Sequence, residues 1–303
     1  MWCTALGRAL GRTGPVCATT VPASTALVSI PYRIGTMKLA LWQTVGFPAD
    51  VAANLAALAS TATAAAAAGA ALVLCPECWL CGYNIGAAVT TLAESADGAS
   101  AQRIAAIARQ YQIAIAYGYV ERDAASASIY NSVQVIGADG AVLSRYRKTH
   151  LFGADERCAY RAGDRFAPPF EFAGFKVGLL ICYDVEYPEA VRSLALMGAD
   201  VVLIPTALTD EYAAVPQFIV PARSIENQLY IAYCNHAGVE NGMRFLGGSC
   251  LTGMDGKALA AAGAGEALII GEISRRAQQE AAKTYPYHTD RRPELYGLLT
   301  TAR

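Results

Sequence analysis

Cys182 stands where an apolar run gives way to polar residues, in the segment Phe175–Glu189, FKVGLLICYDVEYPE. The run Val177–Ile181 has the length and the β-branched content of a buried strand, and a helical pattern begins near Glu189. Enzymes with α/β folds present a nucleophile in this way, on a sharp turn between a strand and a helix. Cys182 is therefore a candidate nucleophile, and the alternative is a buried core cysteine.

Three charged residues, Glu77, Lys148 and Glu156, occupy comparable places, at or after the ends of predicted strands. Ligands bind at the carboxyl ends of strands in α/β sheets, so side chains in such places can converge. A desolvated carboxylate has a raised pKa and can act as a base, and a lysine in a dry site can stabilise an oxyanion. Taken singly, each residue has a plainer interpretation as a surface side chain, with Glu156 paired to Arg157 or Arg161.

A cysteine nucleophile needs a base, a group that stabilises the tetrahedral intermediate, and a proton donor for the leaving amine. A Cys–Glu–Lys set supplies all three functions without histidine. A Cys–His arrangement would use His150 or His236 instead. His150 follows Lys148 by two residues, so on a strand both side chains would face the same side. Spacing alone leaves this alternative open.

Cys75, Cys78 and Cys81 form a C-x-x-C-x-x-C pattern, and thiolates at this spacing can bind zinc or an iron–sulfur cluster. A fourth ligand in a matching context is missing, and Cys75 belongs to an apolar strand, so local packing is the expectation. The sequence contains neither the G-x-x-x-x-G-K-[ST] motif nor the G-x-G-x-x-G motif of nucleotide-binding loops. We therefore expect neither a metal nor a cofactor.

The composition favours a large globular domain, or two, with an ample core, since 54% of the 303 residues are hydrophobic. A net charge of −1 gives no reason to expect nucleic acid or an anionic membrane as a partner. No uninterrupted run of 18 apolar residues indicates a membrane span. Nine cysteines without a small-scaffold spacing indicate reduced thiols and a cytoplasmic protein.

Strands and helices alternate from residue 37 onward, which predicts an α/β fold. Each half of the chain has strands linked by helices and one hairpin with an Asp-Gly turn, at 139–140 and at 255–256. We therefore expect two similar sheets that face each other, with helices outside. The pattern makes 175–182 the central strand, 147–164 a long polar loop, 212–228 one helix, and the C-terminal end a polar tail.

Residues 1–36 differ from the rest, because they contain no Asp or Glu and are rich in Ala, Thr and Gly. Met37 and Lys38, followed by LALWQ, are typical of a protein start that opens on a strand. We expect residues 1–36 to be an unstructured extension or the product of an upstream start, with a targeting segment as the alternative. Residues 37–303 are expected to form the functional domain.

Three segments resemble the nitrilase, or carbon–nitrogen hydrolase, superfamily: LVLCPECWLCGYNIG, NSVQVIGADGAVLSRYRKTHLFG and VGLLICYDVEYPEAVRSLALMGADVVLIPTAL. The likeness extends from about residue 37 to residue 273. Within the superfamily it is greatest to the amidase branch that contains 5-aminopentanamidase and related stereoselective amidases. The segments YRKTHLFG, GYNIG and ICYDVEYPE carry that finer likeness, and the CWLCG segment departs from it in having more cysteines than expected.

The resemblance implies a four-layer αββα sandwich and assembly into a homodimer or a higher homo-oligomer, with the helix 189–197 as a candidate interface. It implies that Cys182 is the nucleophile, Glu77 the base and Glu156 a second carboxylate. Lys148 and the main-chain N–H of Tyr183 would bind the oxyanion.

The resemblance also implies hydrolysis of a short aliphatic or ω-amino amide through a cysteine thioester. Nitrilase or N-carbamoyl amidohydrolase activity is the alternative, and a non-catalytic binding relative is a remote one. A substrate ammonium would need a carboxylate in the pocket, and Asp155, Asp184 and Glu186 are the candidates.

Overall fold

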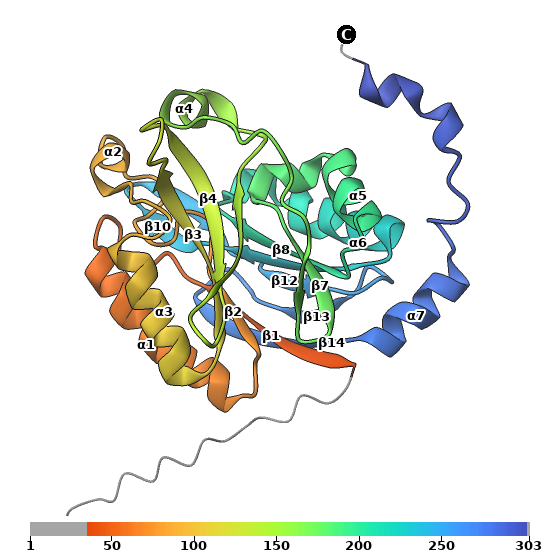
Figure 1. The fold of residues 1–303 in the computed structure, drawn as a ribbon, viewed down its shortest axis with the longest axis horizontal. Helices are drawn as coiled ribbons and strands as arrows, with labels where there is room; N and C mark the ends of the chain where they lie inside the picture. Colours follow the sequence, from red (N-terminus) through yellow and green to blue (C-terminus); the bar gives the residue numbers. More distant parts are fainter. Residues whose placement is uncertain (1–34, 302–303) are drawn as a thin grey trace, which may run out of the picture. The chain divides into compact units, whose positions relative to one another are not determined.

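The strands of residues 35–301, the part of the chain that the computed structural model describes, form two six-stranded sheets and a separate hairpin (Figure 1). The first sheet has the order β14 (Ala267–Ser274), β1 (Thr36–Gln43), β2 (Leu72–Leu74), β3 (Ala114–Arg122), β4 (Ile129–Ile136) and β5 (Val142–Arg147). The second has the order β13 (Ala258–Ala261), β12 (Cys250–Thr252), β9 (Tyr230–Asn235), β8 (Val201–Thr206), β7 (Phe175–Leu179) and β6 (Phe170–Phe172). The hairpin pairs β10 (Ala237–Glu240) with β11 (Met243–Leu246).

The two sheets are built alike. In each, three parallel strands are flanked by antiparallel ones: β1, β2 and β3 in the first sheet, and β7, β8 and β9 in the second. Strands buried on both faces read as continuous apolar runs, which explains VVLI in β8 and YIAYC in β9. The expectation of two similar layers is confirmed.

Alternating side chains of the first sheet serve two different cores. Leu39, Leu41 and Leu72 pack in the cluster that also holds Val177 and Leu203 of the second sheet. The residues between them, such as Ala40 and Val73, join a second cluster with side chains of α1 (Val51–Ala67) and α3 (Ala99–Tyr111). Since successive strand residues point to opposite faces, one sheet contacts its partner on one side and helices on the other.

Helices cover the outer face of each sheet, α1 and α3 on the first, and α5 (Pro188–Leu196) and α6 (Val220–Asn227) on the second (Figure 1). Asp50 caps α1 by accepting a hydrogen bond from the Ala53 N–H at 2.9 Å, and Gly69 follows its end with φ +79°. The layers therefore run helix, sheet, sheet, helix, and the predicted αββα sandwich is confirmed.

Four details differ from the sequence-based expectation. The strand 175–182 is next to the edge rather than central, and β7 ends at Leu179. The loop 147–164 contains a helix, α4 (Gly153–Ala159). The range 212–228 is not one helix, because a five-residue π-helical turn (Val215–Ile219) precedes α6. The strand β14 returns to the first sheet beside β1, so the two sheets are not two consecutive halves of the chain.

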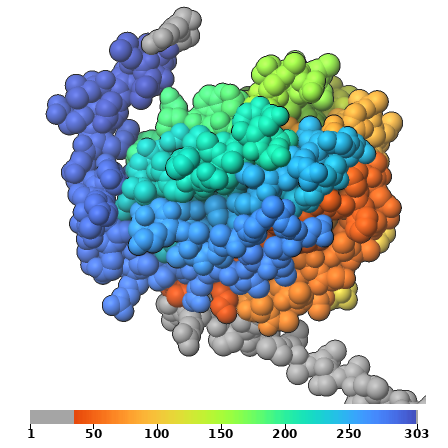
Figure 2. Space-filling model, turned by 180° about the vertical axis from the view of Figure 1, so that it is seen from behind, coloured from red at the N-terminus to blue at the C-terminus, as the bar shows by residue number. Residues whose placement is uncertain are grey.

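The expected polar tail begins as a helix, α7 (Arg275–Thr284), capped by Ser274. Figure 2 shows this C-terminal segment in dark blue along one side, next to the turquoise residues that include α6. Two side chains attach it to the end of α6: Gln278 Nε2 donates to Gln228 O at 3.3 Å, and His288 Nε2 donates to Asn227 O at 2.9 Å. A short helix, α2 (Ala88–Leu92), lies in the loop after β2 and was also missed.

The prediction for residues 1–36 concerns a stretch that lies almost wholly outside the described residues. Within 35–301, none of the helices combines the length and apolar character needed to cross a membrane.

Candidate active site

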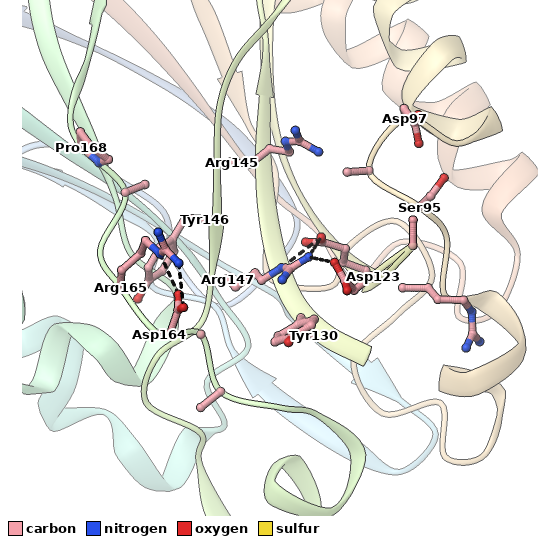
Figure 3. Close-up of a pocket in the computed structure, with 17 residues that line it drawn as sticks. Ser95, Asp97, Asp123, Tyr130, Arg145, Tyr146, Arg147, Asp164, Arg165 and Pro168 are labelled. Carbon is pink, nitrogen blue, oxygen red and sulfur yellow. Dashed lines mark hydrogen bonds and ion pairs between the residues drawn. The ribbon is translucent and has the colours of Figure 1, made fainter. Parts of the chain in front are cut away.

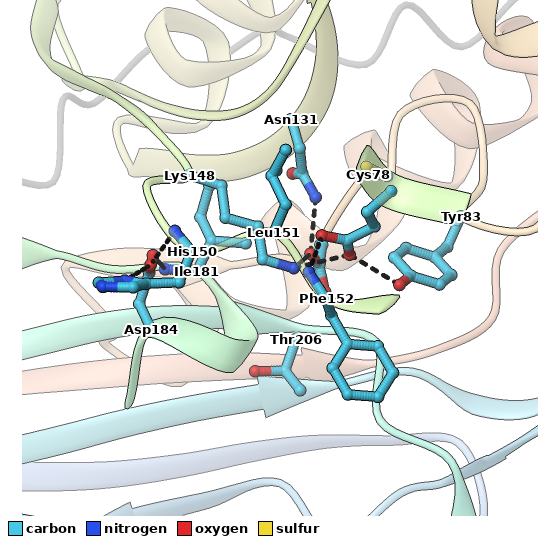
Figure 4. Close-up of polar contacts among 12 residues, drawn as sticks. Cys78, Tyr83, Asn131, Lys148, His150, Leu151, Phe152, Ile181, Asp184 and Thr206 are labelled. Carbon is cyan, nitrogen blue, oxygen red and sulfur yellow. Dashed lines mark hydrogen bonds and ion pairs between the residues drawn. The ribbon is translucent and has the colours of Figure 1, made fainter. Parts of the chain in front are cut away.

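The structure brings three of the predicted side chains into direct contact. Glu77 lies in the loop just after β2, Lys148 directly follows β5, and Glu156 lies on α4. The Lys148 Nζ atom is 2.7 Å from Glu77 Oε1 and 2.7 Å from Glu156 Oε1 (Figure 4). All three side chains are buried, with Glu77 fully inaccessible. The ammonium has three N–H donors, so these two bonds leave one for another acceptor.

One carboxylate oxygen of Glu77 accepts hydrogen bonds, and the other does not. Oε1 accepts hydrogen bonds from Lys148 and from Asn131 Nδ2, the latter at 2.6 Å. Oε2 is buried and has no hydrogen-bond partner among residues 35–301. A buried carboxylate oxygen without a partner is costly, so its presence here needs an explanation. One explanation is that Oε2 accepts a proton from a substrate or from a nucleophile.

Cys182 begins a 3₁₀ turn, Cys182–Glu186, three residues after the end of β7. Its backbone is left-handed, with φ +46°, a conformation that residues other than glycine seldom adopt and that often marks functional sites. The first backbone bond of the turn runs from the Asp184 N–H to Ile181 O, at 3.0 Å. The Tyr183 N–H precedes that bond, so the turn itself gives it no acceptor.

Charges and burial shift the pKa values of this group strongly. Burial raises the pKa of the Cys182 thiol, the charge of Glu77 raises it further, and the charge of Lys148 lowers it. Burial likewise raises the pKa of Glu77 above the ordinary glutamate value, with Lys148 opposing. Burial alone would lower the pKa of Lys148, but Glu77, Cys182 and Glu156 hold it well above its usual value. These shifts favour the protonated forms of both the thiol and the ammonium.

The Asp184 carboxylate joins the nucleophile turn to the end of β5. It accepts hydrogen bonds from Ile181 N (2.9 Å), Tyr146 OH (2.8 Å), Thr149 Oγ1 (3.0 Å) and His150 N (3.0 Å), and His150 Nδ1 lies at 2.8 Å. These partners come from both sheets, because Tyr146 belongs to β5 and Ile181 follows β7. The contact fixes the position of Cys182 relative to Lys148.

Both histidines that could have served as bases form hydrogen bonds to other groups. His150 pairs with Asp184 and stacks on Tyr187 with ring centroids 4.0 Å apart. His236 Nε2 donates to the carbonyl oxygen of Glu77 at 2.7 Å, and burial lowers its pKa to about 4. His236 is therefore a neutral side chain that holds the backbone of Glu77.

Gly118 on β3 is a part of the site that sequence reasoning missed. A Cβ atom at this position would lie 2.5 Å from both Pro76 O and Cys78 N, and 2.8 Å from the carbonyl carbon of Glu77. Only glycine lets the strand and the Glu77 loop approach this closely. The signal was present, because an isolated glycine inside a strand pattern often marks a close backbone approach.

A loop next to Glu77 supplies another contact that was missed, Tyr83. Its hydroxyl donates to Glu156 Oε1 at 2.7 Å, and the Phe152 N–H donates to Glu156 Oε2 at 2.8 Å. The loop is fixed from β10, where Glu240 Oε1 accepts from the Asn84 N–H at 3.1 Å. Glu156 is thus held on both oxygens, which orients it toward Lys148.

The C-x-x-C-x-x-C cysteines divide between two apolar clusters. Cys75 packs in the cluster beneath α1 and α3, whereas Cys78 and Cys81 pack in a smaller one with Val89 and Tyr160. Within residues 35–301, no three His, Cys, Asp or Glu side chains are grouped in a way that could hold a metal ion.

Four aromatic rings pack against one another on the Cys182 turn and the segments next to it. Phe152 packs edge-on against Tyr183 and against Tyr212, with ring centroids 5.2 and 5.5 Å apart, and Tyr183 packs edge-on against Tyr187 at 5.1 Å. We call Phe152, Tyr183, Tyr187 and Tyr212 the aromatic rim. Its apolar faces suit a short aliphatic group close to the thiol.

A cavity of about 770 Å³ lies at a different place, around Tyr130, Arg145 and Arg147 (Figure 3). Its lining includes none of Glu77, Lys148, Glu156 and Cys182. Arg147 is paired there with Glu121 and Asp123. Despite its size, we do not assign it as the substrate site, because it lacks the nucleophile and the base.

Residues 38–283 match the family described as carbon–nitrogen hydrolase. This protein belongs to that family.

The comparisons place the protein among the amidases of the nitrilase superfamily. It is 48% identical over 268 residues to the "Hydrolase in pqqF 5'region" of Pseudomonas protegens, a match that covers 88% of this chain and 93% of the relative. It is 36% identical to an (R)-stereoselective amidase of Pseudomonas sp, covering 87% and 94%. The amidase from Nesterenkonia sp. AN1 superposes with a TM-score of 0.78 at 33% identity, covering 88% and 97%, in a structure with the acetamide moiety of fluoroacetamide attached at the active site cysteine.

Proposed function

We propose that the protein cleaves the C–N bond of a short aliphatic or ω-amino amide, of the type of 5-aminopentanamide, to give a carboxylate and ammonia. The reaction uses a thioester on Cys182 and needs no cofactor. The observation that carries this proposal is the buried Glu77 Oε2, which has no hydrogen-bond partner among residues 35–301 and belongs to a carboxylate whose charge shifts the pKa of the Cys182 thiol. The amidases among the relatives support the choice of an amide.

The first half of the proposed reaction forms the thioester. Glu77 Oε2 takes the thiol proton, and the sulfur of Cys182 attacks the amide carbonyl carbon to form a C–S bond. The remaining N–H donor of Lys148 and the Tyr183 N–H hold the oxyanion. As the tetrahedral intermediate collapses, the C–N bond breaks and Glu77 returns the proton to the leaving ammonia.

The second half regenerates the thiol. Glu77 removes a proton from water, the hydroxide attacks the thioester carbonyl, and the same two donors hold the second oxyanion. The C–S bond then breaks, the thiolate recovers a proton from Glu77, and the carboxylic acid product leaves and loses its proton to water, giving the carboxylate. Glu156 takes no proton in this scheme, because its contact with Lys148 serves to position the ammonium.

Three compounds of matched chain length test the reaction type: 5-aminopentanamide, the corresponding nitrile and the corresponding N-carbamoyl amine. We expect ammonia release from the amide, with kcat/KM far above that for the other two. Faster turnover of the nitrile would favour the nitrilase alternative, and faster turnover of the carbamoyl compound would favour the N-carbamoyl amidohydrolase. A purified, folded protein that turns over none of the three would favour the binding relative.

The pH dependence of kcat/KM is expected to report the Glu77 carboxylate. Because the base must be deprotonated, activity falls as pH falls through its pKa, with a midpoint above the ordinary glutamate value of about 4.3. The Asn131 hydrogen bond lowers the pKa of Glu77, so Asn131→Leu should move the midpoint to higher pH. Asn241→Leu, at an exposed amide that contacts the Asn84 carbonyl, is the control and should leave it unchanged. An Asn131→Leu midpoint equal to that of the wild type would contradict Glu77 as the base.

We also propose a homodimer or higher oligomer formed through the face of α5 and its neighbouring turn. Leu196 at the end of α5 is 52% exposed, and Phe218 in the π-helical turn Val215–Ile219 is 69% exposed. Large exposed apolar side chains often mark an interaction surface. Light scattering of the wild type should give at least twice the monomer mass. Leu196→Glu combined with Phe218→Glu should give a monomer, while Val142→Glu on the distant edge strand β5 should not. A wild-type protein that is monomeric at micromolar concentration would contradict this proposal.

We also propose that the protein is cytoplasmic, and the state of its cysteines supports this. All seven cysteines of residues 35–301 are free, which suits a reducing compartment.

A further inference from the structure

Glu186 ends the 3₁₀ turn that Cys182 begins, and its carboxylate is unusually placed. The side chain is half-buried, and within residues 35–301 its carboxylate has no hydrogen bond or ion pair. Burial raises the pKa of Glu186, while the charges of Lys148 and Arg223 lower it. The carboxylate is therefore within the electrostatic range of the catalytic ammonium, yet it contacts no cation.

The backbone beneath Glu186 is held rigidly by Arg223 of α6. Its Nε donates to Val185 O at 3.0 Å, and its Nη2 donates to Glu186 O at 2.8 Å. Its Nη1 pairs with Glu226 Oε1 at 3.1 Å. Since all three guanidinium nitrogens are committed, Arg223 fixes the position of Glu186 without neutralising its carboxylate by contact.

The other two carboxylates that could recognise a substrate ammonium do not suit the task. Asp184 is fully buried, and its two oxygens already serve Ile181, Tyr146, Thr149 and His150. Asp155 is an exposed residue in the first turn of α4, in contact with water. An exposed carboxylate attracts a cation weakly, because water screens the charge.

We propose that Glu186 binds the ammonium group of the substrate, and that the enzyme therefore selects ω-amino amides over neutral and anionic amides of the same length. A 3₁₀ helix rises about 2.0 Å per residue, so the Cα atoms of Cys182 and Glu186 are separated by about 8 Å along the turn. An extended aliphatic chain of a few methylenes spans a distance of the same order as this Cα separation. The aromatic rim, which includes Tyr183 and Tyr187 on the same segment, would cover that chain.

This inference rests on the proposed amide hydrolysis, and a series of three amides tests it. The probes are 5-aminopentanamide, pentanamide and the monoamide of glutaric acid, which carry charges of +1, 0 and −1 at neutral pH. The wild type should prefer them in that order in kcat/KM. Glu186→Gln should reduce the ratio of the cationic to the neutral amide by about 10- to 100-fold, through KM rather than kcat. Glu186→Lys should invert the order of the charged amides.

Glu189→Gln is the matched control, because Glu189 is an exposed carboxylate only three residues further on, and it should leave all three ratios as in the wild type. A Glu186→Gln ratio equal to that of the wild type overturns the inference. So does an equal loss of kcat for all three amides, which would indicate a catalytic or folding role. Hydrolysis of pentanamide without a preference for the cation overturns this inference alone. A wild type that releases no ammonia from any amide overturns the proposed function itself.

Discussion

Cys182→Ala is expected to lower amide turnover by at least about 10³-fold, because no other group at the site can form the thioester. Cys182→Ser should also be severely impaired, since a hydroxyl is far harder to deprotonate than a thiol and Glu77 is tuned to the thiol. Ammonia release under saturating substrate measures both. Intact mass after incubation with fluoroacetamide gives a second readout, with an adduct on the wild type and none on Cys182→Ala.

Cys158→Ala is the control for this experiment, because Cys158 is the exposed thiol among the cysteines of the described region. It should retain both turnover and the adduct. Retention of wild-type turnover by Cys182→Ala would end the thioester mechanism. An adduct that persists on Cys182→Ala and disappears on Cys158→Ala would place the reactive thiol elsewhere.

Lys148→Met should damage both activity and stability, since two buried carboxylates then face each other without a cation. Removing one partner of a buried ion pair typically costs about 3–5 kcal/mol of unfolding free energy. Loss of an oxyanion donor lowers turnover by about 10²-fold or more. Chemical denaturation and ammonia release measure the two effects separately.

The stability deficit of Lys148→Met should depend on pH in a definite direction. Without the ammonium, burial and the charge of Glu156 raise the pKa of Glu77 in the folded state further above its unfolded value. Folding then takes up protons, so the variant is least stable at neutral pH and recovers as pH falls toward the unfolded carboxylate pKa. Lys176→Met, on the exposed side of β7, is the control and should show neither effect. A stable Lys148→Met protein at pH 7 would contradict the buried triad.

The positions of Glu77, Lys148 and Cys182 after strand ends could be predicted from the sequence because they follow local rules, whereas their catalytic roles rest on the family resemblance. Glu77 and Cys182 each come shortly after a buried parallel strand, and parallel strands present their carboxyl ends at one edge of a sheet. Lys148 follows a hairpin strand whose turn was marked by Asp139 and Gly140. Strand periodicity and turn-forming residues depend on neighbouring positions in the chain, so they can be identified from the sequence before the fold is known.

The parts that were not predicted depend on partners far along the chain. The apolar run continues to Ile181, but β7 ends at Leu179, because the Asp184 carboxylate takes the Ile181 N–H and starts the turn early. Asn131 and Gly118 matter only because β4 and β3 pass beside the Glu77 loop. The Asn131 contact joins residues 54 positions apart, and no local pattern specifies that partner.

The bond network of Asp184 has a consequence for how substrate reaches the thiol. Since this carboxylate ties the Cys182 turn to the residues flanking Lys148, the sheets cannot separate there without breaking it. We therefore expect access to the thiol to be controlled at the aromatic rim, where Phe152 and Tyr212 are 37% and 40% exposed to water.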